Sequence, residues 1–180
     1  MNELGSNKVG FNKARVESAG RHLPNGHPEI IKKIGVLILN LGTPDAYDYF
    51  SVRRYLKEFL SDPRVIEVNP LVWKLILNFC ILPFRPLATC KKYQQIWMKD
   101  HDESPLRYYT KQQAEKLRAV ISSEDNDLVI DYAMRYGNPG IEDRITSLVG
   151  QGCQKIIFIP LYPQYCAATT ATICDEIYRV

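Results

Sequence analysis

Three short apolar runs constrain the fold of this chain most strongly. They span residues 34–40 (IGVLILN), 128–134 (LVIDYAM) and 155–161 (KIIFIPL). Each is rich in Ile, Leu and Val, which is typical of a strand that is buried on both faces of a parallel sheet. Parallel neighbours need long crossover connections, so we expect helices between these strands.

Helical patterns occupy the connections. Apolar residues recur with helical spacing over residues 52–60, 87–99, 105–122 and 141–149, and a last helix is predicted over 169–180. Alternating strands and helices are typical of an α/β fold. We therefore predict a parallel sheet flanked by helices, in a Rossmann-like or flavodoxin-like arrangement.

The 180 residues correspond to about one domain of ordinary size. Residues 1–33 mix Gly, Asn, Pro and charged residues without an apolar run, which predicts a flexible N-terminal tail and no secretory signal peptide. An organellar transit peptide is the less favoured alternative for this segment. Residues 34–180 are predicted to form the α/β domain.

Charge and cysteine content exclude several classes of protein. The chain has 23 Lys plus Arg against 20 Asp plus Glu, without the clustered basic residues of a nucleic-acid-binding domain. It has five Cys and no Cys-x-x-Cys motif, which predicts reduced thiols and a cytoplasmic location. Neither Gly-x-Gly-x-x-Gly nor a P-loop motif occurs, so a nucleotide site is disfavoured. No complete metal or nucleophile site can be assembled from the sequence.

The longest apolar stretch covers residues 71–84 (LVWKLILNFCILPF). It is shorter than the ~20 residues that span a bilayer, and Lys74 and Asn78 interrupt it. Burial against the core of the domain is the favoured interpretation. The alternative is an amphipathic helix that lies on a membrane surface.

Ligands of open parallel sheets bind at the carboxyl ends of the strands. Arg135 lies at such an end, where a guanidinium could hold a ligand carboxylate through two parallel hydrogen bonds. A structural ion pair with Asp131 or Glu142 is an equally weighted alternative. Arg85, between two prolines, is a second candidate cation, although a solvated surface position is common for such a residue.

Two polar residues in the predicted helical region have ordinary structural interpretations. Tyr93 and Trp97 are four residues apart, which predicts a shared helix face packed on the core. Ser104 precedes Pro105, where the N-cap of a helix is expected.

Six motifs then occur in one order along the chain. They are NLGTPD (40–45), VRRYLKEFLSDPRVIE (52–67), LPFRP (82–86), ESPL (103–106), AMRYGNP (133–139) and PLYPQYCAATTAT (160–172). Together they closely resemble the ferrochelatase family, over essentially all of residues 34–180. The resemblance implies a metal chelatase of the lyase class that inserts ferrous iron into a porphyrin, built from two similar Rossmann-like halves with the porphyrin between them.

The chain resembles only the first of these halves. The resemblance places Leu41, Arg135 and Tyr136 in the porphyrin pocket, and Arg85, Tyr93 and Ser104 at an entrance that receives the propionates. Catalytic residues stay unknown, because the family's metal-facing His and its acidic partner belong to the second half. Leu41 and Ile173, rather than Tyr, stand at two rim positions of the pocket, and by the resemblance this implies protoporphyrin IX as the substrate rather than a coproporphyrin.

The resemblance also carries expectations about partners. We expect no bound cofactor and no iron–sulfur cluster, although Cys166 lies near a position where some members carry a cluster ligand. The expected partners are a porphyrin and either a C-terminal half or another chelatase chain. Residues 71–84 are expected to touch a membrane peripherally, and no nucleic-acid partner is expected. The alternative function is a non-enzymatic module that binds porphyrin or haem.

Overall fold

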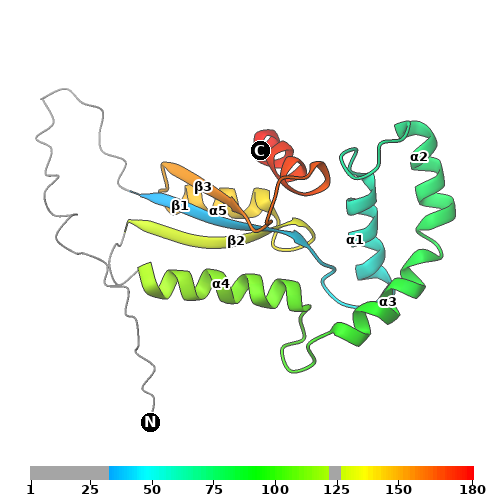
Figure 1. Ribbon diagram of the computed structural model, residues 1–180, viewed down its shortest axis with the longest axis horizontal. Coiled ribbons are helices and arrows are strands. Elements are labelled where there is room, and N and C mark those ends of the chain that lie inside the picture. The colour runs from blue at the N-terminus through cyan, green and yellow to red at the C-terminus, as the bar shows by residue number, and fades with distance from the viewer. Residues whose placement is uncertain (1–32, 122–126) are drawn as a thin grey trace, which may run out of the picture. The chain divides into compact units, whose positions relative to one another are not determined.

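The computed structural model describes residues 33–121 and 127–180. Strands β1 (Ile34–Gly42), β2 (Leu128–Tyr136) and β3 (Lys155–Pro160) form one parallel sheet in the order β2-β1-β3 (Figure 1). The predicted α/β fold with a parallel sheet is confirmed. The predicted tail, residues 1–33, lies outside the described residues except for Lys33.

Helices cover both faces of the sheet (Figure 1). On one face, α4 (Pro105–Ile121) packs on Val36, Ile38 and Ile130. The opposite face carries α5 (Ile141–Gly150) and α6 (Thr172–Arg179), which follows the π-type turn η3 (Ala167–Ala171). Successive residues of β1 therefore point to opposite faces of the sheet, each with its own core. The strand is thus buried on both faces, as its continuous apolar run predicted.

A helical lobe follows β1. It consists of α1 (Tyr49–Ser61), α2 (Pro70–Ile76), the π-helical turn η2 (Leu77–Ile81) and α3 (Arg85–Ile96). Its core joins the apolar stripe of α1 to η2 and to the end of β2, through the buried side chains of Val52, Leu56, Leu60, Leu77, Leu82 and Tyr136. The lobe thus rests on the sheet where β1 and β2 end (Figure 1).

The N-terminus of α1 is capped by Asp48. Its carboxylate accepts hydrogen bonds from the backbone N–H groups of Phe50 and Ser51, at 2.8 and 3.0 Å. These bonds, that from Ser51 foremost, lower the pKa of Asp48 below its ordinary value. The cap fixes the point at which the chain turns from the sheet into the lobe.

The prediction that residues 71–84 are buried in the core is wrong. No residue of α2 is buried, and Leu71, Phe79 and Phe84 are 77%, 73% and 70% exposed. Within this stretch only Leu77 and Leu82 are fully buried in the lobe core, and Trp73 and Ile81 are partly buried against it. The remaining apolar side chains are exposed because α2 and η2 contact α1 along one side and no other described segment covers the other side.

No single described helix is long and apolar enough to cross a membrane. The consecutive segments Pro70–Ile81 and Arg85–Ile96 meet the length and hydropathy requirement only together, and a bend of 68° separates them.

Candidate functional site

A cavity of about 630 Å³ opens beside the carboxyl end of β1. Its walls come from the exit of β1, from α1 and α3, and from the start of α4. The lining residues are Asn40, Leu41, Gly42, Thr43, Tyr55, Tyr93, Ile96, Ser104, Pro105, Leu106, Tyr109, Thr110 and Gln113. Aliphatic and aromatic walls with a few hydroxyl and amide groups are typical of a site for a largely apolar small molecule.

Three of the six predicted site residues line this cavity. They are Leu41 from β1, Tyr93 from α3 and Ser104 from the turn before α4. Residues that are separated by as many as 63 positions therefore meet at one strand end, where parallel sheets place their ligands. Their roles toward a porphyrin remain predictions.

Ser104 is a helix cap as well as a wall residue. It is 1% exposed, and its hydroxyl accepts a hydrogen bond from the backbone N–H of Arg107 at 3.3 Å. The predicted capping role is confirmed. The same hydroxyl can still donate its hydrogen toward the cavity, because a serine oxygen can accept one bond while donating another.

Tyr93 is half-buried in an aromatic environment. Its ring meets that of Tyr55 edge to face, with the ring centres 6.3 Å apart. Burial raises the pKa of the Tyr93 phenol, while the hydroxyls of Tyr55 and Thr43 lower it. The helix face that Tyr93 was predicted to share with Trp97 is wrong, because α3 ends at Ile96. The predicted packing is confirmed for both side chains, since Tyr93 packs against the lobe core and Trp97 is 6% exposed and contacts Tyr47.

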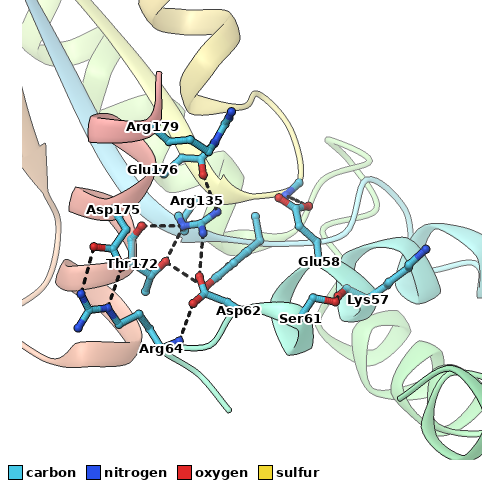
Figure 2. A network of polar contacts seen from close by, with 12 residues as sticks. Lys57, Glu58, Ser61, Asp62, Arg64, Arg135, Thr172, Asp175, Glu176 and Arg179 are labelled. Carbon is cyan, nitrogen blue, oxygen red and sulfur yellow. Dashed lines mark hydrogen bonds and ion pairs between the residues drawn. The ribbon is translucent and has the colours of Figure 1, made fainter. Parts of the chain in front are cut away.

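Arg135 does not line the cavity. It belongs to a network of polar contacts between β2, α6 and the turn after α1 (Figure 2). Its Nη2 lies 2.7 Å from a carboxylate oxygen of Asp62, and its Nε donates to the carbonyl oxygen of Thr172 at 2.9 Å. Its Nη1 lies 3.7 Å from Glu176.

These contacts assign Arg135 a structural ion pair, the second of its predicted alternatives, but with other partners than expected. Asp131 pairs with Arg144 at 3.2 Å, and Glu142 pairs with Arg179 at 2.7 Å. Asp62 was not anticipated because it is 73 residues away in sequence.

Tyr136 is fully buried beside the same pair. Its hydroxyl donates to Asp62 at 2.7 Å and lies 3.0 Å from the hydroxyl of Thr172. The guanidinium of Arg135 stands over the Tyr136 ring, 4.5 Å from its centre. Burial raises the pKa of the Tyr136 phenol. The buried carboxylate of Asp62 thus has its charge balanced and its oxygens hydrogen-bonded, which a buried ion needs.

Arg85 is exposed at the start of α3 and is not among the residues that line the cavity. Of the six predicted residues, the structure therefore brings three together and leaves Arg85, Arg135 and Tyr136 outside the lining. The assignment of these three to a porphyrin stays a prediction.

Two glycines let the exits of β1 and β2 pack directly against each other. Gly42 and Gly137 have φ values of +112° and +79°. A Cβ on Gly42 would lie 1.9 Å from the carbonyl oxygen of Tyr136, and one on Gly137 would lie 2.5 Å from that of Thr43. Only a glycine permits so close a backbone approach at Gly42, and this approach fixes the wall of the cavity.

The model of the family described as ferrochelatase matches residues 33–180. This chain belongs to the ferrochelatase family. It is 55% identical over 148 residues to the ferrochelatase of Francisella tularensis subsp. holarctica (strain OSU18), and 56% identical over 149 residues to that of Rhodopseudomonas palustris (strain HaA2). The matches cover 82% and 83% of this chain and 43% of each relative, so the chain spans less than half the length of these ferrochelatases.

Several residues in or near the site of this ferrochelatase-family chain were not predicted from the sequence. Tyr109 and Gln113 are four residues apart on α4 and reach the cavity, a helical spacing that could have been noticed. Asp45 holds three partners, namely Arg54 at 2.8 Å, Arg107 at 3.4 Å and Asn138 at 3.0 Å. No sequence pattern indicates this cluster, because its four members come from four separate segments, namely the loop after β1, α1, α4 and the loop after β2.

Side chains that commonly bind metal ions do not cluster in the described part of this ferrochelatase-family chain. Within residues 33–121 and 127–180, no group of three or more His, Cys, Asp or Glu is placed to hold a metal ion.

Proposed function

We propose that this chain provides the porphyrin-binding part of a ferrochelatase, which inserts ferrous iron into protoporphyrin IX. The observation that carries the proposal is the cavity at the end of β1, in a chain that belongs to the ferrochelatase family. A porphyrin is a flat apolar disc with carboxylates on its rim. It needs apolar and aromatic walls together with a few polar groups that orient it.

The lining residues meet these needs in distinct ways. Leu41, Ile96 and Leu106 supply aliphatic surface, and Tyr109 supplies an aromatic ring beside them. The hydroxyl of Tyr93 is the group proposed to receive a propionate. Contacts to the rim and walls would hold the ring in a fixed orientation and, during metal insertion, in a bent shape, because remote contacts can stabilise a strained ring.

The base that removes the pyrrole protons and the groups that deliver iron are proposed to come from a second polypeptide segment. This segment would correspond to the length of the related ferrochelatases that the present chain does not cover. It could belong to a C-terminal half or to another chelatase chain. Iron is the substrate in this scheme, and no resident cofactor or iron–sulfur cluster is proposed.

A second part of the proposal concerns the exposed apolar face of the helical lobe. Leu71, Leu75, Phe79 and Phe84 present large apolar side chains to solvent. Exposed apolar surface of this kind is typical of a protein or membrane contact. We propose that the lobe touches a membrane peripherally, where an apolar porphyrin is delivered, in a protein located in the cytoplasm.

The alternative function is a module that binds porphyrin or haem without chemistry. One experiment separates the two: the purified chain is incubated with ferrous iron and protoporphyrin IX without oxygen, while the porphyrin spectrum is followed. Metal insertion by this chain alone would contradict the proposed need for a second segment. Binding without insertion favours the module, and insertion after addition of a separately produced second segment supports the enzyme. A spectrum unchanged by the protein would contradict both functions.

A further inference from the structure

A second cavity, of about 290 Å³, lies between α1 and α2 in the helical lobe. It shares no lining residue with the cavity beside β1, so the proposed porphyrin site does not use it. Its inner surface is apolar, because Leu77 is buried there and Ile66 and Trp73 are partly buried. The indole N–H of Trp73 donates to the carbonyl oxygen of Leu60 at 2.6 Å, which holds the ring in the cavity wall.

Two cations stand at the mouth of this cavity. Lys57 of α1 and Lys74 of α2 both line it, and both are exposed. Among the described residues that line the cavity, none is Asp or Glu. Within residues 33–121 and 127–180, neither lysine has an ion-pair partner. The mouth therefore carries two positive charges that no acidic group in its lining balances.

The carboxylates at this end of α1 face the sheet instead. Asp62 pairs with Arg135, and Glu58 accepts a hydrogen bond from the backbone N–H of Gly137 at 2.9 Å. Lys57 points away from this polar network (Figure 2). The end of α1 thus turns its carboxylates toward the sheet and its lysine toward the cavity.

The cavity adjoins the exposed apolar face of the lobe. Trp73 and Lys74 line the cavity, whereas Leu71 and Leu75 lie on the adjacent face of α2 and are 77% and 62% exposed. An amphipathic helix on a bilayer buries its apolar face about 5–10 Å into the boundary between head groups and acyl chains. Lysines beside that face keep their ammonium groups in the polar layer. In this orientation the mouth of the cavity meets the lipid phosphates.

We propose that this cavity binds one anionic phospholipid, with its phosphate held by Lys57 and Lys74 and the start of an acyl chain against Trp73 and Leu77. The proposal rests on the membrane contact proposed above and names the class of lipid that this contact recognises. Charge complementarity selects the occupant, because two unbalanced cations attract a lipid of net negative charge and repel the ammonium group of a zwitterionic one.

The cavity is tested first without a membrane. Dihexanoyl phosphatidylglycerol and dihexanoyl phosphatidylcholine, both kept below the concentrations at which they form micelles, are titrated into the full 180-residue chain by calorimetry. We expect phosphatidylglycerol to bind about 10-fold more tightly than phosphatidylcholine. The double variant Lys57→Gln/Lys74→Gln should lose this preference. Equal affinities of the parent chain for the two lipids overturn the site.

A matched variant controls for overall charge. Lys116→Gln/Lys155→Gln removes the same charge from exposed lysines outside the lobe and should keep the preference for phosphatidylglycerol. Equal losses in the two double variants would show a general charge effect and overturn the site.

A bulky substitution tests the location. Val68 lines the cavity and is 49% exposed, so Val68→Trp should fill part of it and lower the affinity for dihexanoyl phosphatidylglycerol at least about 5-fold. Val149→Trp, on α5, adds the same bulk elsewhere and should bind like the parent chain. Thermal unfolding checks the fold of each variant. Unchanged affinity of a folded Val68→Trp overturns the assignment to this cavity.

Vesicles separate the lipid site from the membrane contact on which it rests. We expect the parent chain to co-sediment about 10-fold better with vesicles that contain phosphatidylglycerol than with vesicles of phosphatidylcholine alone. Equal binding to both would support the membrane contact and overturn the lipid site. If neither vesicle binds the chain, the membrane contact fails. The soluble lipids then decide the site: a lysine-dependent preference for phosphatidylglycerol supports it, and no preference overturns it.

Discussion

The guanidinium of Arg135 lies 2.7 Å from the carboxylate of Asp62, and this pair joins the end of β2 to the end of α1 (Figure 2). Both side chains are largely shielded from solvent, and Tyr136 and Thr172 supply further hydrogen bonds. The pair thus ties the helical lobe to the sheet and to α6. It also accounts for Arg135 without a ligand.

Removal of Asp62 should therefore destabilise the fold strongly. We expect Asp62→Ala to lower the free energy of unfolding by about 3–5 kcal/mol, because the buried guanidinium of Arg135 would lose its nearest counter-charge and keep only Glu176, at 3.7 Å. Urea denaturation measures this change. Arg54→Ala is the control, since it breaks an exposed pair with Asp45 and should cost about 1 kcal/mol or less. Similar losses in the two variants would contradict the structural importance of the buried pair.

The strand-exit glycines give a second prediction. Gly42→Ala should cost several kcal/mol, roughly the sum of a left-handed backbone penalty of about 1–2 kcal/mol and the displacement of the Tyr136 carbonyl. Gly152→Ala is a matched control. Gly152 also has a positive φ, of +87°, but nothing lies within 4 Å of its would-be Cβ. Thermal or urea unfolding of both variants should show the larger loss at Gly42, and equal losses would mean that the close approach is absent.

The cap of α1 predicts a dependence on pH. Because hydrogen bonds from Ser51 lower the pKa of Asp48 in the folded chain, the charged cap stabilises the fold above the unfolded pKa of about 4. That contribution is lost as the pH falls through the lowered folded pKa. Asp48→Ala should cost about 1 kcal/mol near pH 7 and less below about pH 3.

Asp48→Asn serves as the control for this effect, since an uncharged Asn also caps helices. Near neutral pH, Asp48→Asn should be only slightly less stable than the parent chain. This small difference in the free energy of unfolding should shrink in acid, where Asp48 is protonated. Urea denaturation across pH measures all three chains. A cost of Asp48→Ala that does not change with pH would contradict the role of the charged cap.

The exposed face of the lobe predicts membrane binding. Replacement of Leu71 and Phe79 by Ser should reduce co-sedimentation of the chain with phospholipid vesicles several-fold, because burying each large apolar side chain contributes about 1.5–3 kcal/mol. Val149→Ser removes an exposed apolar residue from α5 and should leave sedimentation unchanged. Equal binding by all variants would argue against a membrane contact through this lobe.

Local patterns in the sequence predicted the framework of the fold but not its long-range contacts. The strands were predictable because a continuous apolar run such as residues 34–40 has few other places to lie. The partner of Arg135 was not, because Asp62 is distant in sequence and no periodicity links the two. The burial of residues 71–84 was predicted wrongly, because an apolar stripe has the same sequence pattern whether it packs on the core of the protein or faces outward.

The candidate site shows the same division. The position of Leu41 and Ser104 followed from a strand end and a helix start, which local patterns mark well. The exclusion of Arg85 from the cavity depends on how α3 is oriented, which no spacing predicts.

Porphyrin binding in the cavity beside β1 is tested most directly by a substitution that blocks this cavity. Leu106 lines this cavity, so Leu106→Trp should fill part of it, whereas Val149→Trp places the same bulk outside it. In a titration with protoporphyrin IX, we expect the parent chain and Val149→Trp to bind, and Leu106→Trp to bind with an affinity lowered at least about 10-fold. Unchanged porphyrin affinity of Leu106→Trp, with the fold intact by thermal unfolding, would contradict porphyrin binding in this cavity.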